Sequence, residues 1–151
     1  MYDKRIVITG IGAITSVGNC VSQIWNSLVA GESGIGPITR FDSEKFSSKI
    51  TGEIKSFDIA NIISPKEAKR LDPFCHYAIA AATEAVKQSN LDLDAMDCTR
   101  VGTLVGSGIG GIITLEKQLE RCIKNGPSKV SPFLVPMMIG DMASGSVAIQ
   151  M

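Results

Sequence analysis

The sequence has no excess of either charge, because 15 acidic side chains balance 15 basic ones among its 151 residues. This balance argues against the broad positive surface that binding to nucleic acid or to an anionic membrane requires. Long apolar runs are also missing, since no stretch approaches the roughly 18 uncharged apolar residues that span a bilayer. The apolar run after Arg5 is interrupted at Gly10 and Gly12 and lacks the cleavage site of a signal peptide. We therefore expect a soluble, cytoplasmic protein that binds neither nucleic acid nor membrane.

Histidine and cysteine are scarce and scattered. The four cysteines, Cys20, Cys75, Cys98 and Cys122, lie at least 23 positions apart without a C-x-x-C motif, and His76 is the only histidine. These spacings argue against a zinc site, and we expect no metal. Cys75 and His76 are neighbours, but adjacent helical side chains diverge by about 100°, so they do not form a nucleophile and base pair. In a reducing compartment, we expect each cysteine to be a small, buried apolar residue. We expect His76 to lie on the surface of a helix.

Short apolar runs predict strands at two places. Residues 5–9 and 101–105 are rich in β-branched and apolar side chains and stop at a glycine, as buried strands do. Residues 49–54 are compatible with an edge strand. Together with the helical periodicity between them, these runs predict an α/β fold, in which a sheet packs against helices within one domain over residues 1–151.

Helical periodicity is present in four segments. Apolar side chains recur at helical spacing over residues 21–29, where Asn19 is the expected cap and Gly31 the expected stop, over residues 112–124, and again after Asp141. These three segments predict helices of ordinary length. The fourth segment carries the clearest start signal.

The clearest helix start is at Ser64. Ser64 can cap the helix, Pro65 suits the first helical position, and Glu67 can reach back to the backbone of Ser64. Small or apolar side chains follow at helical spacing until Asn90, a typical stop. They are Leu71, Cys75, Ala78, Ala82 and Ala85. We therefore expect one long helix from Pro65 to about residue 90.

A glycine-rich turn separates the second predicted strand from the helix that follows it. Residues 106–111 fit G-x-G-x-x-G, the pattern in which backbone amides and a helix N-terminus bind a pyrophosphate. A dinucleotide site also needs an acidic residue about 20 positions further on. Residue 131 is serine, however, and no Asp or Glu lies between Glu120 and Asp141. We expect no nucleotide cofactor, and interpret the turn as a place where the backbone approaches another segment.

Two further segments leave their interpretation open. Residues 133–142 combine aromatic, branched and sulfur side chains, which suit a core, a subunit interface or a pocket for a long apolar ligand. Lys66, Lys69 and Arg70 lie opposite the apolar stripe of the predicted long helix. They form either a solvated face or a docking patch for an acidic partner, which the positive N-terminus of the helix would strengthen.

Three segments together are specific for one family. They are residues 7–19 (VITGIGAITSVGN), residues 30–42 (AGESGIGPITRFD) and residues 101–139, which begin with VGTLVGSGIGG. In combination they resemble the β-ketoacyl-acyl carrier protein synthases, most closely the type II elongating enzymes. The resemblance implies a thiolase-like layered fold, a homodimer, and an acyltransferase of fatty acid biosynthesis that needs no cofactor. Such an enzyme holds an acyl chain on a cysteine and condenses it with malonyl-acyl carrier protein, releasing CO2.

The resemblance also implies that residues 1–151 are the N-terminal part of the synthase N-terminal domain, because family members are much longer. Their nucleophilic cysteine stands in a T-A-C motif expected beyond Met151, with two histidines and a lysine further on, and no cysteine of this sequence lies in such a motif. We therefore expect no catalytic residue and no activity in this chain alone. The alternative is a chain-length factor of a polyketide system, which resembles the synthases but lacks the cysteine.

Residues of an acyl pocket follow from the resemblance. Ile109, in the glycine turn, matches the residue at the bend of that pocket. Phe133, Leu134 and Met138 match residues that line the pocket or reach it from the partner subunit. One departure lies nearby, because residues 140–141 are Gly-Asp where Pro-Asn is frequent.

Residues that meet the acyl carrier protein follow in the same way. Lys66, Lys69, Arg70 and Lys129 match basic positions that contact this acidic partner, which carries the acyl or malonyl group. Ser128 stands where a second basic residue is common. We therefore expect the part of the docking patch around Lys129 to be weaker.

Overall fold

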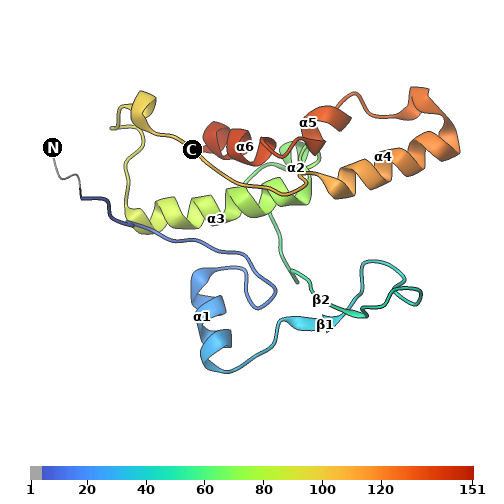
Figure 1. Cartoon of the computed structure of the whole chain (residues 1–151). Helices are drawn as coiled ribbons and strands as arrows, with labels where there is room; N and C mark the ends of the chain where they lie inside the picture. Colours follow the sequence, from blue (N-terminus) through green and yellow to red (C-terminus); the bar gives the residue numbers. More distant parts are fainter. Residues whose placement is uncertain (1–4) are drawn as a thin grey trace.

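Helix α3 (Pro73–Ser89) is the spine of the molecule in the computed structural model, which describes residues 5–151. Helix α6 (Met142–Gln150) lies along α3, and α4 (Ile112–Asn125) extends away from the start of α3 (Figure 1). The remaining elements are α1 (Val21–Val29), β1 (Ile35–Pro37), β2 (Ile50–Gly52), α2 (Pro65–Ala68), η1 (Cys98–Arg100), η2 (Pro127–Lys129) and α5 (Leu134–Met138).

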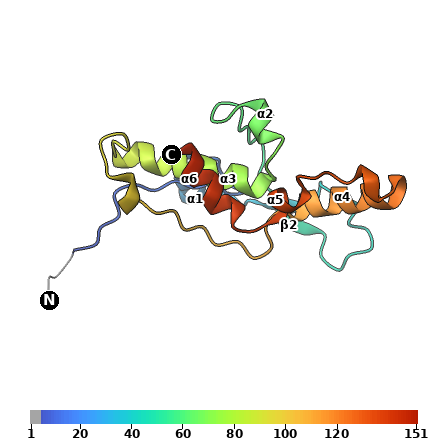
Figure 2. The ribbon, with the colours of Figure 1, turned by 90° about the horizontal axis from the view of Figure 1, so that it is seen from above.

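The core is small and lies where α3, α6 and residues 59–63 meet. Its buried apolar cluster consists of Ile59, Ile63, Ile79, Ala80 and Val147. Full burial of one such branched side chain contributes about 1.5–3 kcal/mol. The packing of α3 against α6 and residues 59–63 therefore stabilises this part of the fold. Seen from above, α2 and the extended segment 101–105 lie on opposite sides of α3 and α6 (Figure 2).

The two segments predicted as buried strands are not strands in this structure. Ile6 and Ile8 are 94% and 85% exposed, and Leu104 is 98% exposed. Neither segment forms a strand ladder with any described residue. Residues 101–105 are instead held to α6, where the Thr103 hydroxyl donates to the Ser144 carbonyl (3.0 Å) and the Ser144 hydroxyl accepts from Val105 N–H (2.9 Å). A strand exists only where another strand pairs with it, and these apolar runs lack that partner within residues 5–151.

The sheet found in the described part of the chain is the hairpin of β1 and β2. The strands are antiparallel, with Ile35 opposite Gly52 and Pro37 opposite Ile50. This confirms the edge strand predicted within residues 49–54. Proline is tolerated in β1 because β1 is an edge strand, where the lack of an N–H on proline removes no hydrogen bond of the ladder.

The predicted long helix from residue 65 to residue 90 is two helices, so that prediction is wrong. Ser64 forms the expected capping box, in which its hydroxyl accepts from Glu67 N–H (3.3 Å) and the Glu67 carboxylate accepts from Ser64 N–H (3.0 Å). However, α2 already ends at Ala68. Pro73 explains the break, because a proline in a continuous helix lacks an N–H and clashes with the preceding turn. Pro73 instead occupies the first turn of α3, which stops at Asn90 in the left-handed conformation (φ 53°), as predicted.

The other three helices match their predictions. α1 covers residues 21–29, α4 covers the predicted 112–124, and α6 begins directly after Asp141. The cap of α1 is Cys20 and not Asn19, and Gly31 has the positive φ (70°) expected after a helix end. Among residues 5–151, no helix combines the length and the apolar character needed to cross a membrane.

The N-terminal segment lies directly on α3. A Cβ atom at Gly10 would stand 2.1 Å from the Ala85 carbonyl oxygen, and one at Gly12 would stand 2.0 Å from the Ala81 carbonyl oxygen. Only glycine permits such contacts between two backbones. The glycines that interrupt the apolar run therefore seat the chain against the outer face of α3.

Candidate functional site

The glycine turn 106–111 is clamped against α5. Gly111 N–H donates to the Met138 carbonyl (2.9 Å). Gly110 has φ 80°, and a Cβ atom on it would stand 2.2 Å from the Met138 carbonyl oxygen. A Cβ atom on Gly111 would stand equally close, 2.2 Å, to the Met137 carbonyl oxygen. The structure thus confirms that the turn lets the backbone approach another segment.

Two of the four residues expected in the acyl pocket are exposed to solvent. Ile109 is 70% exposed on the turn and Phe133 is 47% exposed at the start of α5. Leu134 and Met138 are half-buried on α5. The fold brings the turn against Met138, so residues 29 positions apart in sequence (109 and 138) belong to one local surface.

Three of the four expected docking residues lie within five consecutive positions and are exposed. Lys66 lies in α2, and Lys69 and Arg70 follow it directly. The Arg70 guanidinium lies 5.5 Å from the centre of the Phe133 ring, a cation–π geometry. The docking segment, residues 66–70, is therefore in contact with a residue expected in the acyl pocket.

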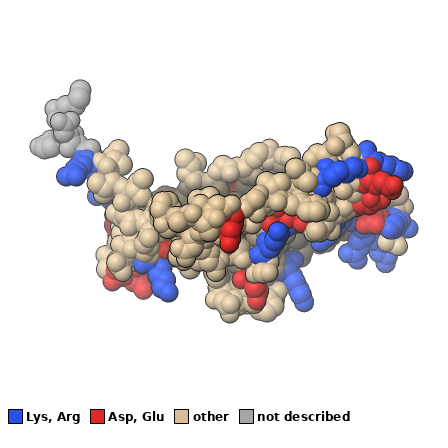
Figure 3. All heavy atoms as spheres, turned by 90° about the horizontal axis from the view of Figure 1, so that it is seen from below, with Lys and Arg blue, Asp and Glu red and all other residues tan. Residues whose placement is uncertain are grey.

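Lys129 is exposed at the other end of α4, a helix about 20 Å long. Basic and acidic side chains gather together at the end of the molecule to which α4 extends (Figure 3). There Lys124 and Glu120 form an ion pair on the helix surface. Lys129 therefore stands apart from residues 66–70, in a region of mixed charge.

A hollow of about 340 Å³ separates the docking segment from the start of α4. Its lining includes Lys69, His76, Thr114, Lys117 and Met137. His76 is half-buried there, and its Nε2 atom lies 2.9 Å from the Ala68 carbonyl oxygen. His76 is therefore not a freely exposed surface residue, and its ring links α3 to the end of α2.

Asp72 is the residue of this region that the sequence interpretation missed. It is 2% exposed, and its carboxylate accepts from Thr114 N–H (2.7 Å) and from Phe74 N–H (3.4 Å). A signal was available, since Asp followed by Pro marks a helix start. The expectation of a continuous helix hid this signal, because it placed Asp72 in the middle of the helix.

The cysteines differ in burial. Cys75 is fully buried, as predicted, and burial raises the pKa of its thiol to about 11. At neutral pH this thiol therefore stays protonated and is a poor nucleophile. Cys20 and Cys122 are half-buried, whereas Cys98 is exposed, which contradicts the prediction for that residue. Cys98 lies in the short η1 helix on the surface, where no element of the described chain covers it.

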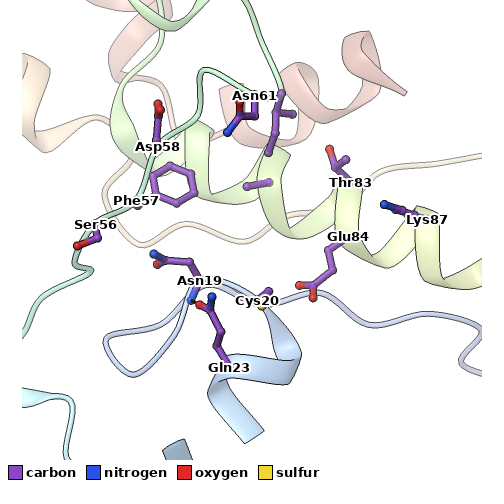
Figure 4. Close-up of a pocket in the computed structure, with 12 residues that line it drawn as sticks. Asn19, Cys20, Gln23, Ser56, Phe57, Asp58, Asn61, Thr83, Glu84 and Lys87 are labelled. Atoms are coloured by element: carbon purple, nitrogen blue, oxygen red, sulfur yellow. Dashed lines mark hydrogen bonds between the residues drawn. The ribbon is translucent and has the colours of Figure 1, made fainter. Parts of the chain in front are cut away.

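A polar cleft of about 500 Å³ lies between the start of α1 and α3, away from the predicted site residues (Figure 4). Asn19 and Gln23 line it from the α1 side, and Glu84 and Lys87 line it from α3. The Glu84 carboxylate accepts from Val21 N–H (2.9 Å) and Ala13 N–H (3.1 Å), so it fastens α1 to α3. Glu84, in the C-terminal half of α3, thus accepts from two backbone amides as Asp72 does at the start of the helix.

Solved structures with the same fold define the class of the protein. The chain superposes with a TM-score of 0.79 on a chain of the ishigamide ketosynthase/chain length factor, at 29% identity over 95% of this chain and 36% of that chain. It also superposes with a TM-score of 0.77 on one chain of a complex between a type II PKS acyl-carrier protein and its ketosynthase bound to the hexaketide. The identity is 26% over 97% of this chain and 39% of that chain. The fold is that of the thiolase-like ketosynthases.

The family follows from sequence comparison. Residues 3–151 match the family described as "Beta-ketoacyl synthase, N-terminal domain", and the chain belongs to it. Over 148 residues, or 98% of its length, the chain is 45% identical to 3-oxoacyl-[acyl-carrier-protein] synthase 2 of Synechocystis sp.. Over 149 residues, or 99% of its length, the chain is 47% identical to the synthase of the same name from Staphylococcus aureus (strain COL). The chain spans 36% of the length of each relative.

Proposed function

We propose that this chain belongs to a condensing enzyme of fatty acid elongation. The enzyme transfers an acyl chain to a cysteine and condenses it with malonyl-acyl carrier protein, with loss of CO2, to give 3-oxoacyl-acyl carrier protein. The observation that carries the proposal is the 45–47% identity, over nearly the whole chain, to two synthases of that name. Residues 1–151 form the N-terminal part of the family's N-terminal domain in this proposal, and the reacting groups come from elsewhere in the enzyme.

The acyl pocket of this enzyme includes Ile109, Phe133, Leu134 and Met138. Support comes from the clamp between the glycine turn and α5, in which Gly110, the residue after Ile109, lies against the Met138 carbonyl. All four side chains are apolar, as a wall for an acyl chain requires. Val135 and Ile139 add exposed apolar surface to α5, at 56% and 44% exposed. This surface supports a homodimer in which α5 of one subunit meets its partner.

The acyl carrier protein docks on Lys66, Lys69 and Arg70, with a further contact at Lys129. Exposed cations beside an apolar pocket suit an acidic carrier that must deliver its acyl group nearby. One of the structural neighbours is a ketosynthase in complex with an acyl-carrier protein, which supports a partner of this kind. The proposed enzyme uses no cofactor and works in the cytoplasm.

A chain-length factor remains the second candidate. It is supported by the likeness to the ishigamide ketosynthase/chain length factor, at 29% identity. The higher identity to the two synthases favours the condensing enzyme. A cysteine in a T-A-C motif in the full-length protein separates the two candidates, because the chain-length factor lacks it.

The direct test measures condensation by the full-length protein that carries these residues. Malonyl-acyl carrier protein is supplied with acyl donors from octanoyl to palmitoyl, and both 3-oxoacyl-acyl carrier protein and CO2 are quantified. We expect both products in equal amounts. A full-length protein that binds acyl carrier protein but forms neither product would overturn the proposal in favour of the chain-length factor.

A further inference from the structure

Helix α4 begins without a capping side chain of its own. Its N-cap residue is Gly111, which has no side chain to accept from the first amides of the helix. A capping residue such as Ser or Asp does not fit there, because a Cβ atom would stand 2.2 Å from the Met137 carbonyl oxygen. The clamp that holds the glycine turn therefore excludes a local cap. The unpaired amides of a buried helix start need a partner from another segment.

Asp72 supplies this partner. Its Oδ2 atom accepts from Thr114 N–H, in the first turn of α4, at 2.7 Å, and its Oδ1 atom accepts from Phe74 N–H, in the first turn of α3, at 3.4 Å. The residue is 2% exposed, so its charge is shielded from solvent and lies at the positive ends of two helices. One buried carboxylate thus caps both α3 and α4.

This carboxylate lies between the two proposed binding surfaces. On one side, Asp72 lies two positions after Arg70, the last residue of the docking segment. On the other side, the start of α4 follows Ile109 by three positions and is fixed to Met138 through Gly111. A displacement of the docking segment therefore reaches the turn through one short chain of bonds.

We infer that Asp72 is a positioning residue that sets the shape of the acyl pocket from a place directly beside the docking segment. This inference rests on the proposed function. Asp72 touches neither surface's ligand; it fixes the start of α4, and through it the turn that carries Ile109. The consequence is that the charge and both oxygens of Asp72 matter for long acyl chains, which extend to Ile109, more than for short ones.

The test uses Asp72→Asn in the full-length enzyme. Asparagine keeps the shape and one acceptor oxygen but loses the charge and the second acceptor, and charge-assisted hydrogen bonds are the stronger ones. We expect kcat/KM for a myristoyl donor to fall about tenfold, which corresponds to about 1.4 kcal/mol. The butyryl donor should change by less than about twofold, and KM for the carrier protein should stay within about twofold, because Lys66, Lys69 and Arg70 are intact.

Glu84→Gln is the matched control, because it changes the same kind of double acceptor in the C-terminal half of α3, away from both proposed surfaces. It should lower the melting temperature comparably but leave the ratio of myristoyl to butyryl activity unchanged. Thr114→Pro removes the amide donor and leaves Asp72 in place. It should change the ratio as Asp72→Asn does, and the double variant should add no further change.

Three results would overturn the inference. They are an equal loss for both donors in Asp72→Asn, an unchanged ratio in Thr114→Pro, and a ratio altered by Glu84→Gln as much as by Asp72→Asn. A wild-type enzyme that condenses neither donor would instead remove the proposed function, and the inference with it. The wild-type assay therefore separates the two failures.

Discussion

Ile109 stands on a turn whose following residues, Gly110 and Gly111, are held against α5. It lies between Gly108 and Gly110, and its side chain is 70% exposed. We predict that Ile109→Phe in the full-length enzyme slows acylation by a myristoyl donor by about one to two decades, because overpacking a pocket wall costs roughly 1–3 kcal/mol. Acylation by a butyryl donor, which ends short of this wall, should change far less. Acylation rates with both donors, together with the melting temperature, check this prediction.

Ile123→Phe is the control for this substitution. Ile123 is 80% exposed on the last turns of α4, away from the glycine turn, and the same added bulk should leave both donors unaffected. If Ile109→Phe slows both donors equally and lowers the melting temperature, Ile109 is a packing residue and not part of an acyl pocket.

At the level of residues, the sequence predicted those whose partners are close in the chain. Ser64 and Glu67 are three positions apart, and Asn90 ends the helix it belongs to, so local rules suffice for them. The bond from Asp72 to Thr114 joins residues 42 positions apart. No local pattern specifies that pairing, because it depends on how α3 and α4 are placed by the whole fold.

Among the elements, α2 owes its start to a capping box that depends on pH. Hydrogen bonds from the Ser64 hydroxyl, and then from the Ser64 backbone, lower the pKa of the Glu67 carboxyl below its ordinary value of 4.5. A carboxyl whose pKa is lower in the folded state adds stability above its unfolded pKa, and this stability is lost as the pH falls through the folded pKa. We predict that the melting temperature of wild type falls more steeply than that of Glu67→Gln below about pH 4.5.

The pH experiment has an internal control in Ser64→Ala. Without the hydroxyl, Glu67→Gln should alter the pH dependence much less than it does in wild type. Melting curves between pH 7 and pH 3.5 for the four combinations of these two positions measure the difference. Parallel curves for wild type and Glu67→Gln would show that the capping box does not lower the pKa of Glu67.

The docking segment is tested by reversing its charge. We predict that Lys66→Glu with Lys69→Glu, in the full-length enzyme, lowers kcat/KM for the carrier protein about tenfold at low salt and flattens its salt dependence, because exposed charges act mainly on the rate of encounter. Lys45→Glu with Lys55→Glu makes the same change in net charge at exposed positions elsewhere and should have little effect. Unchanged kinetics at low salt in the first variant would make the segment an ordinary solvated surface.

Elements were predictable where their periodicity did not depend on distant partners. The apolar spacing of α1, α4 and α6 predicted all three helices, since a helix satisfies its own backbone. Residues 5–9 and 101–105 have the composition of strands, but a strand needs a neighbour to pair with, and composition does not supply one. The predicted continuous helix through Pro73 was wrong for another reason. The prediction followed the apolar stripe, although a proline breaks a continuous helix.

Within residues 5–151, the buried cysteine and the single histidine are not arranged as a nucleophile and its base. Cys75 is buried with a raised pKa, and the ring of His76 is bound to a backbone carbonyl. We predict that residues 1–151, expressed alone, consume no malonyl-acyl carrier protein above a control without protein, since condensation needs an activated nucleophile. The full-length enzyme assayed in parallel is the positive control. Turnover by the short chain would show that it contains a nucleophile that neither the sequence nor the structure identifies.

For the whole fold, the resemblance carried by residues 7–19, 30–42 and 101–139 was the decisive sequence signal. Periodicity gave the α/β class, but not the layered arrangement, because several arrangements of the same elements satisfy the same pattern. The candidate site was predictable only through that resemblance. The glycine turn was recognised as a close approach, yet its partner, α5, became known from the structure.

The shared cap at Asp72 also bears on the order in which the helices form. Helix α3 contains both of its own signals, since Asp72 starts it and Asn90 ends it, so it can nucleate from local contacts. Helix α4 lacks a cap until the intervening chain closes and brings Thr114 to Asp72, 42 positions away. This closure costs chain entropy before the hydrogen bond can form. We therefore expect α3 to serve as the folding nucleus and α4 to consolidate on it later. We expect the same carboxylate that positions the glycine turn in the folded protein to set a late step of folding as well.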